Sequence, residues 1–216
     1  MTTVTKDKIC EAAVQIASRD GLLAMTLENV AREAGITKGG VMYHFPSKDE
    51  LIRGTLEYFS QQCEIMLMRR VVDDPEPRMR WARCMVDCLF PKNSAADSTD
   101  DFPTDVLARF FVATLTGAVT SPGAMQPLRD LAAKMRSRCL SDPRDGMEQL
   151  LVWLTIDGLL LWQFMGLIGP DDPLIRQVGD SLRARIAAQL QVTIPSDSPM
   201  QTLIKIPLLK TEEAAR

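Results

Sequence analysis

The sequence has little of what catalytic and metal sites are usually built from. It contains one histidine and five cysteines, and no two cysteines form a C-x-x-C motif. A zinc site needs several His or Cys ligands, and a Ser-His-Asp site needs a histidine with two placed partners, so neither is indicated. No phosphate-binding loop or nucleophile–base pair is found, and the odd, scattered cysteines predict no disulfide framework. We therefore predict no enzyme activity, no metal and no cofactor.

An excess of basic charge is missing as well. The chain carries 25 Lys and Arg against 28 Asp and Glu, a net charge of −3. Residues 1–48 hold six basic and five acidic side chains, so this part is nearly neutral. Charge alone therefore does not indicate a nucleic-acid partner, and such a function must rest on where Lys38 and Lys48 point.

No signal peptide is indicated, and one hydrophobic run has the length to cross a membrane. Residues 1–8 are polar, which predicts a cytoplasmic protein. The run covers residues 150–169, but Asp157 near its middle would cost about 2.5–3.5 kcal/mol on insertion. Polar residues gather on one side of its helical projection: Glu148, Gln149, Thr155 and Gln163. We interpret the run as a helix of a globular protein with no membrane partner.

What the sequence does contain is a series of amphipathic helices. Residues 5–20 have an apolar stripe at helical spacing and end at Gly21. Residues 26–34 repeat this spacing, with Thr26 placed to cap the helix and Gly35 to end it with a positive φ. The apolar residues between the two helices are expected to pack beneath the second: Leu22, Leu23 and Met25.

A second cap, Thr37, begins a helix over residues 38–44 that is too short to be stable without packing through Val41 and Phe45. Ala31 is small where the two short helices must cross, which is typical of a helix-turn-helix. The outer face would present hydroxyls, a cation, an aromatic ring and an imidazole, all suited to phosphates and base edges. By spacing alone, a helical hairpin that does not bind DNA fits equally well.

The chain leaves this motif through a capping box. Ser47 is placed to cap the next helix, and Glu50 follows three residues later. Lys48 then lies in the first turn, near Tyr43 and His44, on the side where a DNA backbone would run. The helix continues to about residue 72.

Together these residues resemble the TetR-type bacterial transcriptional regulators. The resemblance covers about residues 5–55 and rests on a spaced set: Thr26, Ala31, Gly35, Thr37, Gly39, His44, Phe45, Lys48 and Leu51. It departs at one place, because the family usually has tyrosine two places before the histidine, where this chain has Met42. We therefore assign that phosphate contact to the neighbouring Tyr43.

The resemblance implies an all-α fold with two parts. A three-helix helix-turn-helix DNA-binding domain is expected at residues 1–50, and a helical ligand-binding and dimerisation domain at residues 51–191, before a tail at 192–216. The implied partners are a double-stranded DNA operator, a second copy of the chain and a small-molecule effector. The residues assigned to DNA are Thr26, Thr37, Lys38, Gly39, Tyr43, His44 and Lys48.

Breaks rich in Pro and Asp divide the second part into further helices. The helix expected at residues 78–90 would turn Trp81, Met85, Val86 and Leu89 inward and three arginines outward: Arg78, Arg80 and Arg83. The remaining predictions are a surface loop at 91–103 and helices at 104–120, 124–140, 144–169 and 174–191. In the family the last two long helices commonly form a four-helix dimer interface, and the resemblance implies the same here.

The expected effector site centres on an acid in an apolar setting. On a helical projection Asp157 lies among bulky apolar side chains, so its charge needs a partner: an arginine, a hydroxyl or a bound cation. Two roles for Asp157 remain open: an acid with a protein partner at a contact between helices, or a direct contact to the ligand. The residues assigned to the ligand are Trp81, Phe110, Trp153, Asp157 and Phe164.

The sequence therefore predicts a ligand-responsive transcriptional repressor that acts as a homodimer. Its effector would be small and mostly apolar, and cationic if Asp157 faces it. The alternative is a helical membrane-associated or signalling adaptor in which the helix-turn-helix does not bind DNA.

Overall fold

The computed structural model describes residues 2–90, 106, 109–111, 113–114, 117, 120–169 and 171–192, and within these the regular elements are all helical. This confirms the all-α prediction. The helices are α1 (Thr2–Asp20), α2 (Leu27–Ala34), α3 (Lys38–His44), α4 (Lys48–Asp73), α5 (Arg80–Leu89), α7 (Gln126–Leu140), α8 (Gly146–Phe164) and α9 (Pro173–Gln191).

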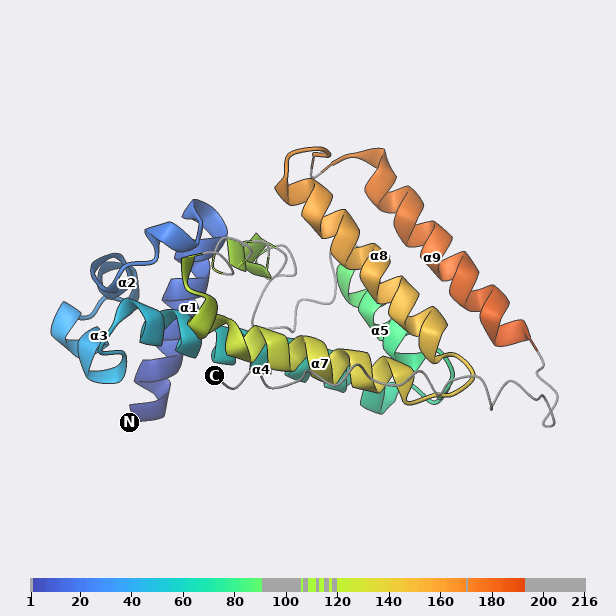
Figure 1. The fold of residues 1–216 in the computed structure, drawn as a ribbon, viewed down its shortest axis with the longest axis horizontal. Helices are drawn as coiled ribbons and strands as arrows, with labels where there is room; N and C mark the ends of the chain where they lie inside the picture. Colours follow the sequence, from blue (N-terminus) through green and yellow to red (C-terminus); the bar gives the residue numbers. More distant parts are fainter. Residues whose placement is uncertain are drawn as a thin grey trace, which may run out of the picture.

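Two apolar clusters are joined by one long helix. Helices α1 to α3 lie at one end of the molecule and α5, α8 and α9 at the other, while α4 and α7 run side by side between them (Figure 1). Leu51 and Leu56 of α4 belong to the first cluster, and Leu67 and Val71 belong to the second. Helix α4 therefore connects the core beneath α2 and α3 to the core of the other helices. The predicted boundaries at residues 50 and 191 stay a prediction.

The turn between α1 and α2 differs from the prediction at one residue. Gly21 has φ 84° and ends α1, and Leu22 and Met25 are buried as predicted. Leu23, predicted to pack inward, is 61% exposed. The reason is that Leu22–Ala24 forms a 3₁₀ turn, in which consecutive side chains point about 120° apart and cannot share one face.

The predicted orientation of two arginines is wrong. Helix α5 begins at Arg80, and the Arg78 side chain just before it is only 16% exposed, where it pairs with the fully buried Asp145 at 2.9 Å. Arg83, also predicted to point outward, pairs with the half-buried Asp74 at 2.6 Å. Both arginines point inward because carboxylates from other segments neutralise their charges there. The polarity pattern of residues 78–90 does not show where those carboxylates lie.

Arg78 also holds the end of the last helix. Its guanidinium donates hydrogen bonds to the carbonyl oxygens of Gln189, Leu190 and Val192 at the carboxyl end of α9, where intrahelical donors run out. The Gln189 amide donates to Asp145 at 3.1 Å. Burial raises the pKa of Asp145, but the hydrogen bonds from Arg78 and Gln189 outweigh it and hold that pKa below its ordinary value.

One residue of the predicted polar side of α8 is buried. Gln149, predicted on a polar side, is buried, where its amide oxygen accepts the Trp81 backbone N–H at 2.9 Å and so serves the first turn of α5. The exposed side carries Thr155 but is otherwise largely apolar, with side chains 40% to 60% exposed: Met147, Leu151, Leu154, Leu161, Trp162 and Met165. A buried side-chain amide is stable when it accepts a hydrogen bond from a backbone N–H. The polarity of Gln149 therefore did not indicate that it faces solvent.

None of the helices described has the length and apolar character needed to span a membrane. The predicted loop at 91–103 and the tail after residue 192 lie outside the described residues. Of the predicted helix at 104–120, the eight residues that are described are helical.

Candidate nucleic-acid interface

Two capped helices form the motif that the sequence predicts. The Thr26 hydroxyl oxygen accepts the Asn29 backbone N–H at 3.1 Å, and the Thr37 hydroxyl oxygen accepts that of Gly40 at the same distance. Between them Gly35 adopts φ 66°, ψ 34°, the left-handed conformation that glycine tolerates best. Both predicted helix starts and the turn are confirmed.

Helix α3 is fixed from below by two buried side chains. Val41 is fully buried and Phe45 is 3% exposed, and both belong to the first apolar cluster. The Phe45 ring lies against the backbone of Gly54 in α4, so close that a Cβ atom on Gly54 would be 2.3 Å from the Phe45 Cε1 atom. Seven residues are too few for a stable helix in water, so these contacts hold α3 in place.

We expect Gly54→Ala to destabilise the protein by about 1–3 kcal/mol, because the new methyl group would push Phe45 out of a packed core. Thermal unfolding measures this. Gly123→Ala is the matched control, since a Cβ atom there meets nothing within 4 Å. An unchanged melting temperature for Gly54→Ala would show that Phe45 is not held against α4.

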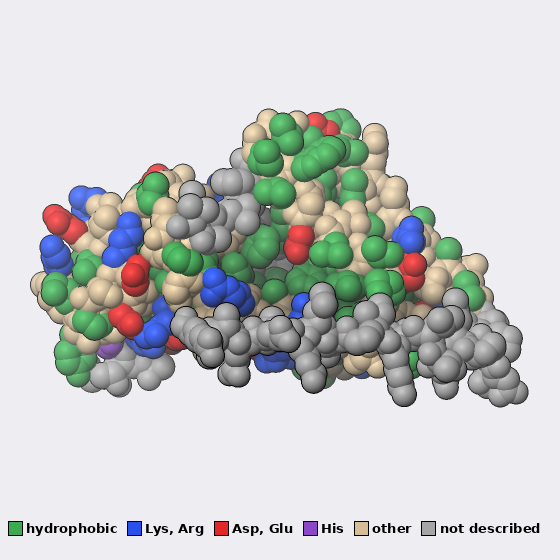
Figure 2. Space-filling model, viewed as in Figure 1, with side chains coloured by type: hydrophobic (Ala, Val, Ile, Leu, Met, Phe, Trp, Pro, Cys, Tyr) green, Lys and Arg blue, Asp and Glu red, His purple; other side chains and the backbone are tan. Residues whose placement is uncertain are grey.

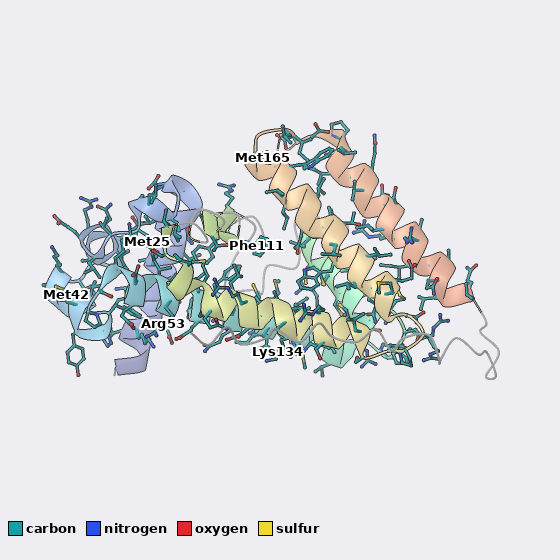
Figure 3. The ribbon with its side chains drawn as sticks, viewed as in Figure 1. Met25, Met42, Arg53, Phe111, Lys134 and Met165 are labelled. Atoms are coloured by element: carbon teal, nitrogen blue, oxygen red, sulfur yellow. The ribbon has the colours of Figure 1, made fainter. Side chains whose placement is uncertain are left out.

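The outer face of α3 is largely exposed. The Tyr43 side chain is 79% exposed and its ring meets that of His44 edge-on, with centroids 5.1 Å apart. Thr37, Lys38 and Gly39 are exposed as well. Met42 lies at the outer edge of this end of the molecule (Figure 3), and the single histidine lies at the same end (Figure 2). Sequence reasoning treated Met42 only as a departure from a pattern, although its spacing places it on this exposed helix.

Lys38 is available for an anionic partner. Its ammonium nitrogen lies 4.0 Å from a Glu28 carboxylate oxygen, and both side chains are more than half exposed. An exposed ion pair of this kind contributes about 0–1 kcal/mol, so it would yield readily to a phosphate.

Two residues assigned to DNA are engaged inside the chain. The Lys48 ammonium donates to the Leu23 carbonyl oxygen at 3.1 Å, which ties the start of α4 to the turn before α2. The Thr26 hydroxyl is occupied as the cap of α2. The structure thus brings Thr37, Lys38, Gly39 and Tyr43 together on one exposed face, with His44 half-buried beside them.

The residues assigned to the ligand do not all meet. Phe110 is fully buried in the first cluster, where its ring lies 4.7 Å from that of Phe59. Trp81 and Trp153 pack against the second cluster instead. One face of Trp81 is covered by the Arg138 guanidinium, 4.9 Å from the ring centroid. The Phe164 side chain lies outside what the structure describes.

Asp157 is half-buried on α8, beside Trp153. Burial raises the pKa of its carboxyl to about 6, and a hydrogen bond from the Trp153 side chain only partly opposes this. Among the residues described, no lysine or arginine pairs with it. The arginine that the sequence analysis considered as a partner is therefore not found in this part of the chain.

Two family models match this chain. Residues 9–55 match the bacterial regulatory proteins of the tetR family, and residues 79–187, half of the chain, match the tetracyclin repressor-like C-terminal domain. The chain belongs to the TetR family. The first match contains all of α2 and α3, and the second contains α5, α7 and α8.

Curated TetR-family relatives match over part of their length. The regulator SrpR of Pseudomonas putida is 36% identical over 52 residues, which cover 24% of this chain and 24% of SrpR. The transcriptional repressor BepR of Brucella suis is 27% identical over 139 residues, 63% of this chain and 61% of BepR. Across the curated relatives that it matches, the chain spans between 19% and 61% of their length.

Solved structures share the TetR-family fold over most of the chain. A transcriptional regulator from Saccharomonospora viridis, crystallised in complex with choline, superposes with a TM-score of 0.65 and 16% sequence identity. The match covers 86% of this chain and 96% of that protein. The shared fold extends beyond the helix-turn-helix to the helices of the second cluster.

Proposed function

We propose that this chain is a ligand-responsive transcriptional repressor that binds operator DNA as a homodimer and acts by binding rather than by catalysis. One observation carries the proposal: α3 is anchored by Val41 and Phe45, while Lys38 and Tyr43 are exposed on its outer face. Membership of the TetR family and the likeness to the repressor BepR support it. An adaptor role without DNA binding is not favoured, because it leaves this face unused.

Each subunit would place α3 in a major groove. Lys38 and Tyr43 would contact phosphates, while Thr37 and Gly39 would let the helix start approach the DNA backbone and base edges. His44 borders this face, and Thr26 and Lys48 remain proposed contacts that would have to add DNA to their present hydrogen bonds. Because the proposed partner is chromosomal DNA, we place the protein in the cytoplasm.

Selection of bound fragments from random DNA tests this proposal. A dimer with two α3 helices should enrich a near-palindromic site whose half-sites are about one helical turn, roughly 34–36 Å, apart or a multiple of that. Binding with no sequence preference, or to single half-sites only, would contradict it. Few cations face the DNA, so we expect affinity to fall modestly with salt.

The homodimer would form through the exposed apolar face of α8. Gly158 lies near its middle, and a Cβ atom there meets nothing within 4 Å, so another helix could approach closely. A two-fold axis at Gly158 would set Leu154 against the partner's Trp162 and Leu151 against the partner's Met165. Exposed apolar side chains in such number on one helix favour burial against a second copy.

We expect Leu154→Glu to convert the dimer to a monomer at micromolar concentration, because two buried carboxylates would face the apolar side chains of the partner. Analytical ultracentrifugation measures the mass. Leu140→Glu serves as the control, since Leu140 is similarly exposed at the end of α7, away from this face. A dimer that survives in Leu154→Glu would place the interface elsewhere.

The effector would bind among the helices of the second cluster. A hollow floored by hydrophobic side chains opens between the two ends of the molecule (Figure 2), and the Saccharomonospora viridis regulator holds choline within the same fold. To release DNA, the effector must bind the DNA-incompetent arrangement more tightly than the competent one. Helix α4 contributes to both clusters, so a shift at its far end could reach α3.

A further inference from the structure

Four half-buried or buried acids around the second cluster share one feature. Asp145 pairs with Arg78 at 2.9 Å, Asp142 with Arg144 at 3.5 Å, and Glu148 with Arg185 at 2.8 Å. Asp172 lies at the amino end of α9, where it accepts the Leu174 backbone N–H at 2.9 Å. Each of these carboxylates therefore meets a cation or the positive end of a helix.

Asp157 lacks that feature. The Trp153 side chain is its neutral hydrogen-bond partner, and among the residues described no charged group contributes to its raised pKa. Trp153 and Leu160 lie one turn before and after it on the same stripe of α8, and both pack at the edge of the second cluster. An ionised carboxylate in such a place is unfavourable without a counter-charge.

The space next to Asp157 can accept a ligand. Asp157 itself is only half-buried, and a hollow floored by hydrophobic side chains opens between the two ends of the molecule (Figure 2). Helix α8 contains no lysine or arginine that could supply a counter-charge from its own turns. A group that entered here would meet one carboxylate, one indole and aliphatic walls.

We propose that Asp157 is the counter-ion of the effector, which is a monovalent organic cation whose apolar body lies against Trp153 and Leu160. This rests on the proposed function, in which an effector binds this part of the chain. An ammonium or phosphonium centre would replace the missing positive charge and gain attraction from the indole ring. A metal ion fits poorly, because it needs several ligands and no group of three His, Cys, Asp or Glu among the residues described could supply them.

The test compares a cation with its uncharged isostere on the full chain, without DNA. Phenyltrimethylammonium and tert-butylbenzene have nearly the same shape, and tetraphenylphosphonium is a larger cationic probe; binding is followed by tryptophan fluorescence at pH 8. We expect phenyltrimethylammonium to bind at least about tenfold more tightly than tert-butylbenzene. Asp157→Asn should remove that preference and leave the affinity for tert-butylbenzene unchanged. Glu148→Gln, on the same helix, should leave both affinities unchanged.

Acidification gives a second readout of the same group. Burial raises the pKa of Asp157 to about 6, so lowering the pH from 8 to 5 should neutralise it and abolish the cation preference of the native chain. Asp157→Asn should show no such dependence. The same substitution should raise the melting temperature at pH 8 by about 2–4 °C and have no effect below pH 3.8, where the acid is protonated in both folded and unfolded chains.

Three results would overturn the proposal: equal affinity for the cation and its isostere, no loss in Asp157→Asn, or no binding of either cation. A lower melting temperature in Asp157→Asn would instead identify an acid that serves the fold. Operator binding is measured separately, so its presence without a cation preference would reject only this inference. A cation preference without operator binding would reject the proposed function alone.

Discussion

Replacing both Lys38 and Tyr43 with alanine is expected to weaken operator binding by about 10³-fold while the chain still folds and dimerises. The two side chains are exposed on α3, and neither belongs to an apolar cluster, so their loss costs the fold little. Each lost contact costs at least about 1 kcal/mol, and a dimer loses four of them. The anchoring residues Val41 and Phe45 are untouched, which keeps α3 in place.

Fluorescence anisotropy with a selected DNA fragment measures this at fixed salt. Arg136→Ala is the control, because Arg136 is exposed on α7, far along the chain from α3. The single variants separate the roles: Lys38→Ala should lower the slope of log affinity against log salt by about two for the dimer, whereas Tyr43→Ala should leave the slope nearly unchanged. Undiminished DNA binding by the double variant would show that the surface that contacts DNA is not the outer face of α3.

Loss of the Asp145 carboxylate is expected to be the most destabilising single change in the second cluster, by about 3–5 kcal/mol. In Asp145→Ala the Arg78 guanidinium, 16% exposed, would keep its charge without a counter-ion, and Gln189 would lose an acceptor. Contacts between the turn before α5, the start of α8 and the end of α9 would weaken together. The melting temperature should fall by roughly 10 °C.

Thermal unfolding at pH 7 tests this, with Asp142→Ala as the control for an acid whose arginine partner is 54% exposed. The double variant Arg78→Met with Asp145→Leu should recover part of the loss, because it removes both buried charges. Pairing holds the pKa of Asp145 below 3.8, so its contribution is complete above pH 3.8 and is lost as the pH falls below that value. An Asp145→Ala variant as stable as the native chain would show that the pair is dispensable.

The helix-turn-helix was predictable because its determinants are local. Thr26, Thr37 and Ser47 each accept a backbone N–H three residues ahead, and Gly35 supplies the positive φ. Such interactions depend on neighbours along the chain, so spacing alone located the ends of α2, α3 and α4 and the exposed position of Lys38 and Tyr43. The same holds for Val41 and Phe45, whose apolar character and spacing marked them as anchors.

Predictions failed where a distant partner decides the environment of a polar side chain. Arg78 points inward because Asp145 lies 67 residues away in sequence yet within hydrogen-bond distance. Gln149 is buried because the first turn of α5 needs an acceptor. None of these pairings has a sequence period, so helical projections assigned the wrong face.

The sequence by itself determined the helices, their caps and the residues that α3 presents outward, since each follows from hydrogen bonds and apolar spacing within a few turns. Only the tertiary structure decided which charges around the second cluster are neutralised, that α8 exposes a largely apolar face, and that Asp157 meets no cation among the residues described. The physical reason is that burial and charge pairing depend on segments that meet only after folding.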